Sequence, residues 1–193
     1  NLAGFANAQR LAYDCAETVG AMLQPGWTEK RAAQLMDTYL CDHGVKAFFH
    51  RSFAWWGART RFQAFKKSSD FFSGDRTLED GDVFILDTAP IVDGFVGDIG
   101  YTHSLVPHLG LEAAKARLLK FRQDLPGFFS SSLTTAEIWE KVDSETRASG
   151  FDNIHAMYPF SVLGHRVYKV PFSGMPGLLY PFGFHAYWAG SSR

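Results

Sequence analysis

Two aspartates lie at positions where the surrounding pattern calls for apolar side chains. Asp87 belongs to the apolar run Asp82–Ala89, and Asp98 belongs to the run Phe95–Val106. A buried carboxylate costs several kcal/mol, and two that lie side by side cost more unless a cation compensates their charge. If the two runs bring these aspartates together, the chemistry that suits them is the binding of one or two divalent metal ions.

The dipeptide Asp93-Gly94 separates the two runs and suits the positive backbone dihedrals of a tight turn, so the segment predicts a β-hairpin. Two registers are open. A turn centred on Val92-Asp93 pairs Asp87 with Asp98, whereas a turn centred on Asp93-Gly94 pairs Asp98 with Ala89. Both registers put the two carboxylates on one face, roughly 5 Å apart at Cβ if opposed and roughly 7 Å apart if diagonal. The alternative is that one aspartate only serves the turn or lies exposed at a sheet edge.

The rest of the chain predicts an α+β protein with a repeated helical motif. Thr28 and Gly44 bracket one predicted helix and Thr134 and Gly150 bracket another; the two threonines, like the two glycines, are 106 residues apart. This echo indicates two similar α-β halves around a shared sheet. We also expect helices over 5–24 and 111–121, the second one broken by Pro126-Gly127, strands over 45–56 and from Phe151, and an irregular stretch over 57–74.

Composition places the chain among ordinary globular proteins. Its 193 residues contain no linker, so we expect a single domain over residues 1–193, and 46% hydrophobic residues allow a substantial core. A net charge of −1 provides no basic field for nucleic acid. Two unclustered cysteines, the absence of a long apolar stretch and the lack of a signal pattern lead us to expect a cytoplasmic protein without a membrane partner. The chain does not begin with methionine, which fits a fragment.

His165 is the histidine whose surroundings favour a ligand role. It follows a glycine inside the apolar run Ser161–Val167, where a buried imidazole needs a partner. A metal ligand and a satisfied core histidine are both open from this pattern alone.

The segment GDVFILDTAPIVDGFVGDIGYT, with eleven residues from Asp87 to Asp98 and Gly164-His165 following 66 and 67 residues after Asp98, resembles the methionine aminopeptidase, aminopeptidase P and prolidase family of M24 metallopeptidases. The resemblance extends from the Pro25–Glu29 segment to His165. It implies the pita-bread fold, in which two pseudo-symmetric α-β halves surround a central antiparallel sheet. In that family the aspartate matching Asp87 chelates one metal ion, the one matching Asp98 bridges two, and the histidine matching His165 binds the other.

The chain also departs from the family pattern. The family completes its site with two glutamates that would lie beyond Arg193, so we expect the C-terminal part of the site either to be missing from the chain or to be degenerate. Arg166 and Thr88 stand where glycine is usual. The family has a substrate-facing histidine shortly before the first aspartate, where this chain has Ser68, Ser69 and Asp70; His50, 37 residues before Asp87, does not match that spacing.

The resemblance implies a metal-dependent hydrolase that acts on the N-terminal residue of a peptide or on an X-Pro bond. Its cofactor would be two divalent ions, drawn from Mn, Fe, Co and Zn, which hold a hydroxide between them. The partner would be a peptide or small amide substrate, with a homodimer left open and the general base unassigned. Two alternatives stay open: a metal-free pita-bread binding module, and a creatinase-type hydrolase in which a histidine replaces the metal.

The repulsion between the two carboxylates carries an expectation about stability. If nothing compensates it, metal-free Asp98→Asn should be at least as stable as the wild type, by about 1 kcal/mol or more.

Overall fold

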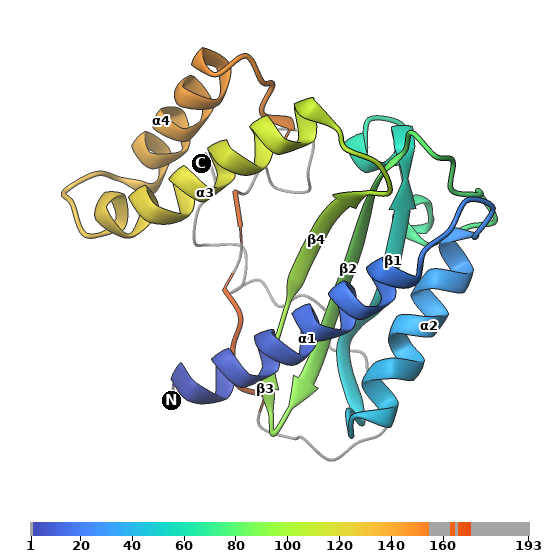
Figure 1. Cartoon of the computed structure of the whole chain (residues 1–193). Helices are drawn as coiled ribbons and strands as arrows, with labels where there is room; N and C mark the ends of the chain where they lie inside the picture. The colour runs from blue at the N-terminus through green and yellow to red at the C-terminus, as the bar shows by residue number, and fades with distance from the viewer. Residues whose placement is uncertain (1, 155–162, 165, 171–193) are drawn as a thin grey trace. The chain divides into compact units, whose positions relative to one another are not determined.

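The computed structural model describes residues 2–154, 163–164 and 166–170. The chain divides into two compact units, which are described in turn. The first spans Asn1–Pro107 and Val167–Pro181, and the second spans His108–Arg166 and Phe182–Arg193. Figure 1 shows a sheet with two helices in the first unit and a pair of helices in the second. That the chain acts as one catalytic domain stays a prediction.

The first unit is built on an antiparallel sheet of β1 (Ala47–Trp56), β2 (Val83–Val92), β3 (Phe95–Val96) and β4 (Ile99–Ser104). β2 is central: β1 pairs with it on one side, and β3 and β4 pair with it on the other. Asp93 and Gly94 both have positive φ, 51° and 83°, and they form the predicted two-residue turn between β2 and β3. The hairpin is therefore confirmed, in the register that is centred on Asp93-Gly94.

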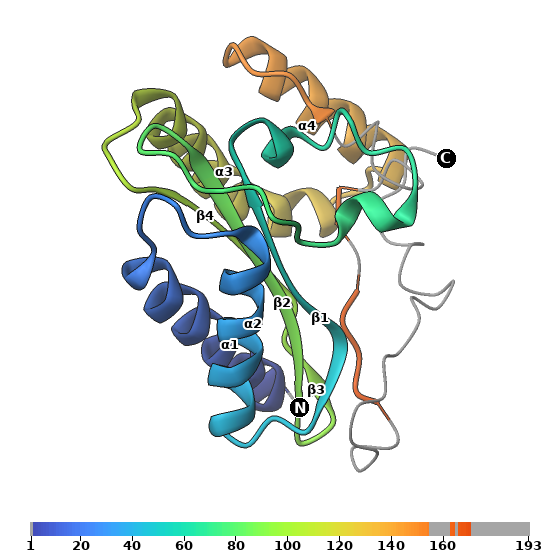
Figure 2. The ribbon, with the colours of Figure 1, turned by 90° about the vertical axis from the view of Figure 1, so that its right-hand side faces the viewer.

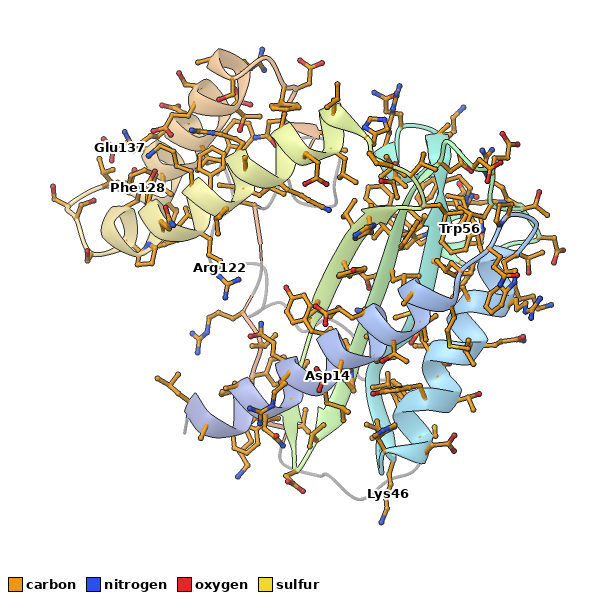
Figure 3. All side chains as sticks on the ribbon, in the orientation of Figure 1. Asp14, Lys46, Trp56, Arg122, Phe128 and Glu137 are labelled. Atoms are coloured by element: carbon orange, nitrogen blue, oxygen red, sulfur yellow. The ribbon has the colours of Figure 1, made fainter. Side chains whose placement is uncertain are left out.

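Helices α1 (Leu2–Met22) and α2 (Glu29–Asp42) cover one face of this sheet, side by side (Figure 2). Small residues of α1 allow the close approach, because Ala8, Ala12 and Ala16 are all fully buried. Most of the side chains of β1 and β2 that point to the helices are apolar, and Trp56, labelled in Figure 3 at the end of β1, is fully buried among them. The exceptions are Ser52 and Thr88, which are buried and bond to each other through their hydroxyl groups at 2.9 Å. The predicted helices are confirmed, with α1 beginning three residues earlier than expected.

The second unit repeats the helical pair of the first. Helix α3 (Leu109–Phe129) has 21 residues like α1, and α4 (Thr135–Ala148) has 14 residues like α2. Thr28 and Thr134 each accept a hydrogen bond from the backbone N–H three residues on, and Gly44 and Gly150 follow their helices with φ of 87° and 79°. These matching lengths and caps support the predicted repeat.

Two expectations for the second unit are corrected. Pro126 does not break the helix after residue 121, because α3 continues through it to Phe129. A proline forfeits one N–H bond, and near the helix end this loss is small enough for the last turn to form. Residues 151–153 are not a strand, and residues 155–162, where the predicted strand continues, lie outside the described residues.

On α3 and α4 themselves, Lys141 lies over the ring of Phe128, and Glu137 completes the α4 cap (Figure 3).

None of the helices among the described residues is long and apolar enough to cross a membrane.

Glu29, at the start of α2, is a fully buried carboxylate that joins three segments of the first unit. Its Oε1 accepts hydrogen bonds from the Trp56 N–H at 3.0 Å and the Arg59 Nε–H at 2.9 Å, and its Oε2 accepts one from the Gly74 N–H at 3.0 Å. The ion pair and the two backbone bonds tie α2 to the end of β1 and to the long connection before β2.

We predict that Glu29→Gln destabilises the protein by about 3–5 kcal/mol, because it leaves the Arg59 charge uncompensated and turns an NH₂ group toward backbone donors. Urea denaturation of the wild type and the variant measures the difference in their free energies of unfolding. Glu112→Gln removes a carboxylate from the exposed pair with Lys115 and should leave the midpoint at the wild-type value. A Glu29→Gln midpoint equal to that of the control would show that the buried network is not structural.

Gly97 lies where α1 approaches the hairpin closely. A Cβ at this position would meet the backbone carbon and oxygen of Ala8 at 2.4 Å, closer than real Cβ contacts come. Because Gly97 directly precedes Asp98, this contact also helps to position the second aspartate, which lies just before β4.

Gly97→Ala should therefore destabilise the protein by about 1–3 kcal/mol through overpacking against α1. Gly100→Ala is the matched control on the same hairpin, since its Cβ would lie 3.7 Å from the nearest atom, an ordinary contact distance. Equal denaturant midpoints for the two variants, at unchanged m-value, would contradict the close packing of α1 on the hairpin.

Candidate metal centre

Three potential metal ligands meet on the sheet face that points away from α1 and α2: His50 from β1, Asp87 from β2 and Asp98 just before β4. One ligand atom from each lies within 4.8 Å of the others. His50 Nε2 is 3.5 Å from Asp87 Oδ1 and 3.6 Å from Asp98 Oδ1. The side chains are 17%, 25% and 12% exposed, so the cluster is half-buried and still reachable from solvent.

The strand register explains how the two aspartates come together. Asp87 pairs with Gly100 and Thr88 with Ile99, so Asp98 continues this ladder opposite Ala89. Asp87 and Asp98 are therefore diagonal neighbours on one face, as one of the two predicted registers has it. Ala89 is fully buried, and its methyl group leaves space above β2 for longer side chains from both neighbouring strands to approach each other.

His50 reaches the same face because β1 is irregular. It pairs with Ala89, whereas Phe53 pairs with Asp87, so β1 uses three residues where β2 uses two. In an unbulged strand, residues three apart point to opposite faces, and His50 would then point toward the helices. A second register shift follows between His50 and Phe48. The spacing argument assigned His50 no role, because a one-residue bulge is not visible in residue spacing.

The imidazole of His50 is held from several sides. Its Nδ1 lies 2.9 Å from the backbone oxygen of Arg51, its ring stacks on Phe53 at 5.3 Å, and the ring of Phe49 meets it edge-on at 6.0 Å. With Nδ1–H donating to the carbonyl, Nε2 is the nitrogen directed at the two carboxylates.

The negative charge of the two carboxylates raises the pKa of His50. Burial lowers its pKa, but the polar contact with Asp98 and the negative charges of Asp87 and Asp98 raise it by more, to about 9. At neutral pH the metal-free cluster therefore contains an imidazolium that compensates part of the carboxylate charge. This cation opposes the repulsion on which the expectation for Asp98→Asn rests, because removing Asp98 removes an attraction to His50 as well as a repulsion from Asp87. The stability of that variant stays a prediction.

His165, the third predicted ligand, lies outside the described residues, so its ligand role stays a prediction. Asp70, at the position of the family's substrate-facing histidine, accepts hydrogen bonds from the Lys66 and Lys67 N–H groups and stabilises its own turn. The Lys66 bond is the main cause of a lowered pKa of Asp70.

Comparison with known proteins places this geometry in context. The model of the family described as Metallopeptidase family M24 matches residues 3–168. No curated protein matches the chain by sequence.

Solved structures share the fold at low sequence identity. The X-Pro aminopeptidase from Thermotoga maritima is 15% identical, with a TM-score of 0.65 over 98% of this chain and 55% of that one. The Xaa-Pro dipeptidase from Bacillus anthracis is 18% identical, with a TM-score of 0.60 over 93% of this chain and 48% of that one. The zinc-substituted aminopeptidase P from Escherichia coli in complex with product is 15% identical, with a TM-score of 0.52 over 62% of this chain and 26% of that one. The predicted pita-bread fold is confirmed, and the chain spans about half the length of the first two proteins.

The raised pKa of His50 predicts how the stability of the metal-free protein depends on pH. Folding favours the protonated imidazole, so the stabilisation is complete below the ordinary pKa of 6.5 and is lost as pH rises toward about 9. The loss should amount to about 3 kcal/mol at most. Urea midpoints measured in chelator across this range should fall for the wild type, and His50→Gln should flatten the curve. His43→Gln, which changes an exposed histidine after α2, should keep the wild-type slope; a flat wild-type curve would contradict the ion pairing.

Proposed function

The chain belongs to metallopeptidase family M24, and on that premise we propose that it is a metal-dependent peptidase of the aminopeptidase P or prolidase type. Its substrate would be a peptide or small amide, cleaved after the N-terminal residue or at an X-Pro bond. The observation that carries the proposal is the placement of Asp87 and Asp98 on one face of the hairpin, with an imidazole nitrogen within 4.8 Å of the carboxylate oxygens. The fold neighbours whose names specify X-Pro substrates support this choice.

The donor set fits a divalent transition ion. Two carboxylate oxygens and one imidazole nitrogen suit Mn, Fe, Co or Zn better than a soft-metal site or a purely oxygen-liganded one. The two carboxylates lie 3.5 and 3.6 Å from His50 Nε2, so their negative charge favours a cation at this position. We propose that Asp87 chelates one ion, that Asp98 bridges two, and that His165 holds the second, as the family resemblance implies.

A bound divalent ion would lower the pKa of a water molecule and polarise a substrate carbonyl. The chain's own residues supply the surroundings for this chemistry. Asp87 and Asp98 provide the negative charge, and Phe53, stacked between His50 and Trp55, forms an apolar wall beside the triad. Such a wall excludes water on one side of the ligands and strengthens the electrostatic interactions within the site.

Metal loading tests the proposal directly. We expect the purified chain to bind Mn²⁺, Co²⁺ or Zn²⁺ in elemental analysis, and Asp87→Asn and Asp98→Asn to lose that metal. Asp93→Asn is the matched control: it removes the same charge from the same hairpin, and asparagine tolerates the positive φ of 51° at this turn position. Its metal content should equal that of the wild type.

Activity separates the remaining alternatives. Hydrolysis of unblocked and X-Pro peptides should require added metal wherever it is detected, and we expect the 193-residue chain by itself to be inactive because its three predicted ligands leave the second ion weakly held. Failure of the wild type to bind any divalent ion would overturn the peptidase proposal and favour a metal-free binding module. Turnover that survives chelator would favour a creatinase-type hydrolase.

A further inference from the structure

We propose that His50 is itself a metal ligand, so that His50, Asp87 and Asp98 form a three-ligand site for one ion within the first unit. The inference rests on the proposed function and extends it, because the family resemblance assigns the histidine ligand to His165 and none to β1. His50 and Asp87 come from neighbouring strands of one sheet, Asp98 lies between β3 and β4, and their ligand atoms lie within 4.8 Å of one another.

The distances from His50 Nε2 to the two carboxylate oxygens suit ligands that share an ion. His50 Nε2 lies 3.5 Å from Asp87 Oδ1 and 3.6 Å from Asp98 Oδ1. Two ligands bound at about 2.0–2.2 Å to a tetrahedral ion lie about 3.4 Å from each other. A cation therefore fits among the three atoms with little movement of the side chains.

The second nitrogen of His50 is occupied in the way that is typical of metal-bound histidines. Nδ1 lies 2.9 Å from the Arg51 backbone oxygen, so its hydrogen is donated to the backbone. Such an outer hydrogen bond fixes the tautomer and the ring orientation, and it leaves the Nε2 lone pair for the ion. The nitrogen that remains is the one that faces Asp87 and Asp98.

The local backbone is arranged to present this imidazole. The bulge between His50 and Phe53 turns His50 to the face of the aspartates. On that face the small side chain of Ala89 leaves room above β2, and the ring of Phe53 stacks on the imidazole. Bulges disrupt the ladder locally, and they are over-represented beside active sites, where they redirect a side chain. The position of His50 thus depends on several independent features that all point to one set of carboxylates.

Titration of the full chain with Zn²⁺ and Co²⁺ tests the assignment, with calorimetry for affinity and visible absorption of the cobalt form for coordination. Loss of an outer-shell partner alone typically weakens metal binding 10–100-fold. We therefore expect His50→Gln to weaken the tightest site by about 100-fold or more, whereas His165→Gln leaves that site within about threefold of the wild type. His43→Gln is the control for removing a histidine from an exposed position.

A measurement on the unmodified protein guards against a variant that fails to fold. On addition of Zn²⁺, the Nε2 resonance of His50 in nitrogen NMR should move to the position of a metal-bound nitrogen, while Nδ1 keeps its proton. If the wild type binds metal, the His50 resonances stay unchanged and His165→Gln abolishes the site, the inference is overturned and the proposed function stands. If the wild type binds no metal, the proposed function fails, and this inference fails with it.

Discussion

The negative charge on one face of the hairpin is the constraint on which the arrangement of the first unit depends. Asp87 and Asp98 are half-buried among apolar strands, where two carboxylates need a positive partner. In the metal-free protein His50 supplies it, and the contact with Asp98 and the charges of both aspartates raise the pKa of His50 in spite of its burial. The same attraction would act on a metal ion. The carboxylate charge that makes this cluster unfavourable to bury would therefore also favour the binding of a cation.

The packing on the opposite face holds this charge in position. α1 contacts the hairpin so closely at Gly97 that a methyl group would not fit, and Glu29 ties α2 to the end of β1 through the Trp56 N–H. Because α1 packs against the hairpin and α2 is bonded to the end of β1, a shift of β1 relative to the hairpin would disturb a buried contact. Sites on such rigid elements keep their geometry better than sites on loops.

Much of this arrangement follows from local patterns in the sequence. The turn at Asp93-Gly94 requires two positive φ values, which that dipeptide supplies, and a two-residue turn then determines the pairing of every later residue up to Ser104. The capped helices after Thr28 and Thr134 are equally local. Asp87 and Asp98 could be predicted as neighbours because their relation depends only on the turn and on the alternation of side chains.

His50 could not be found in the same way, because its partners are set by a bulge in a strand that joins β2 only after a connection of 26 residues, from Gly57 to Asp82. One signal was present: His50, Arg51 and Ser52 interrupt an otherwise apolar strand with three polar residues in a row, which simple alternation does not explain. The number of residues between two positions can only be compared with the spacing in a known motif. Pairing across strands decides which residues meet, so a residue on a separate strand can join the two aspartates that the motif identifies.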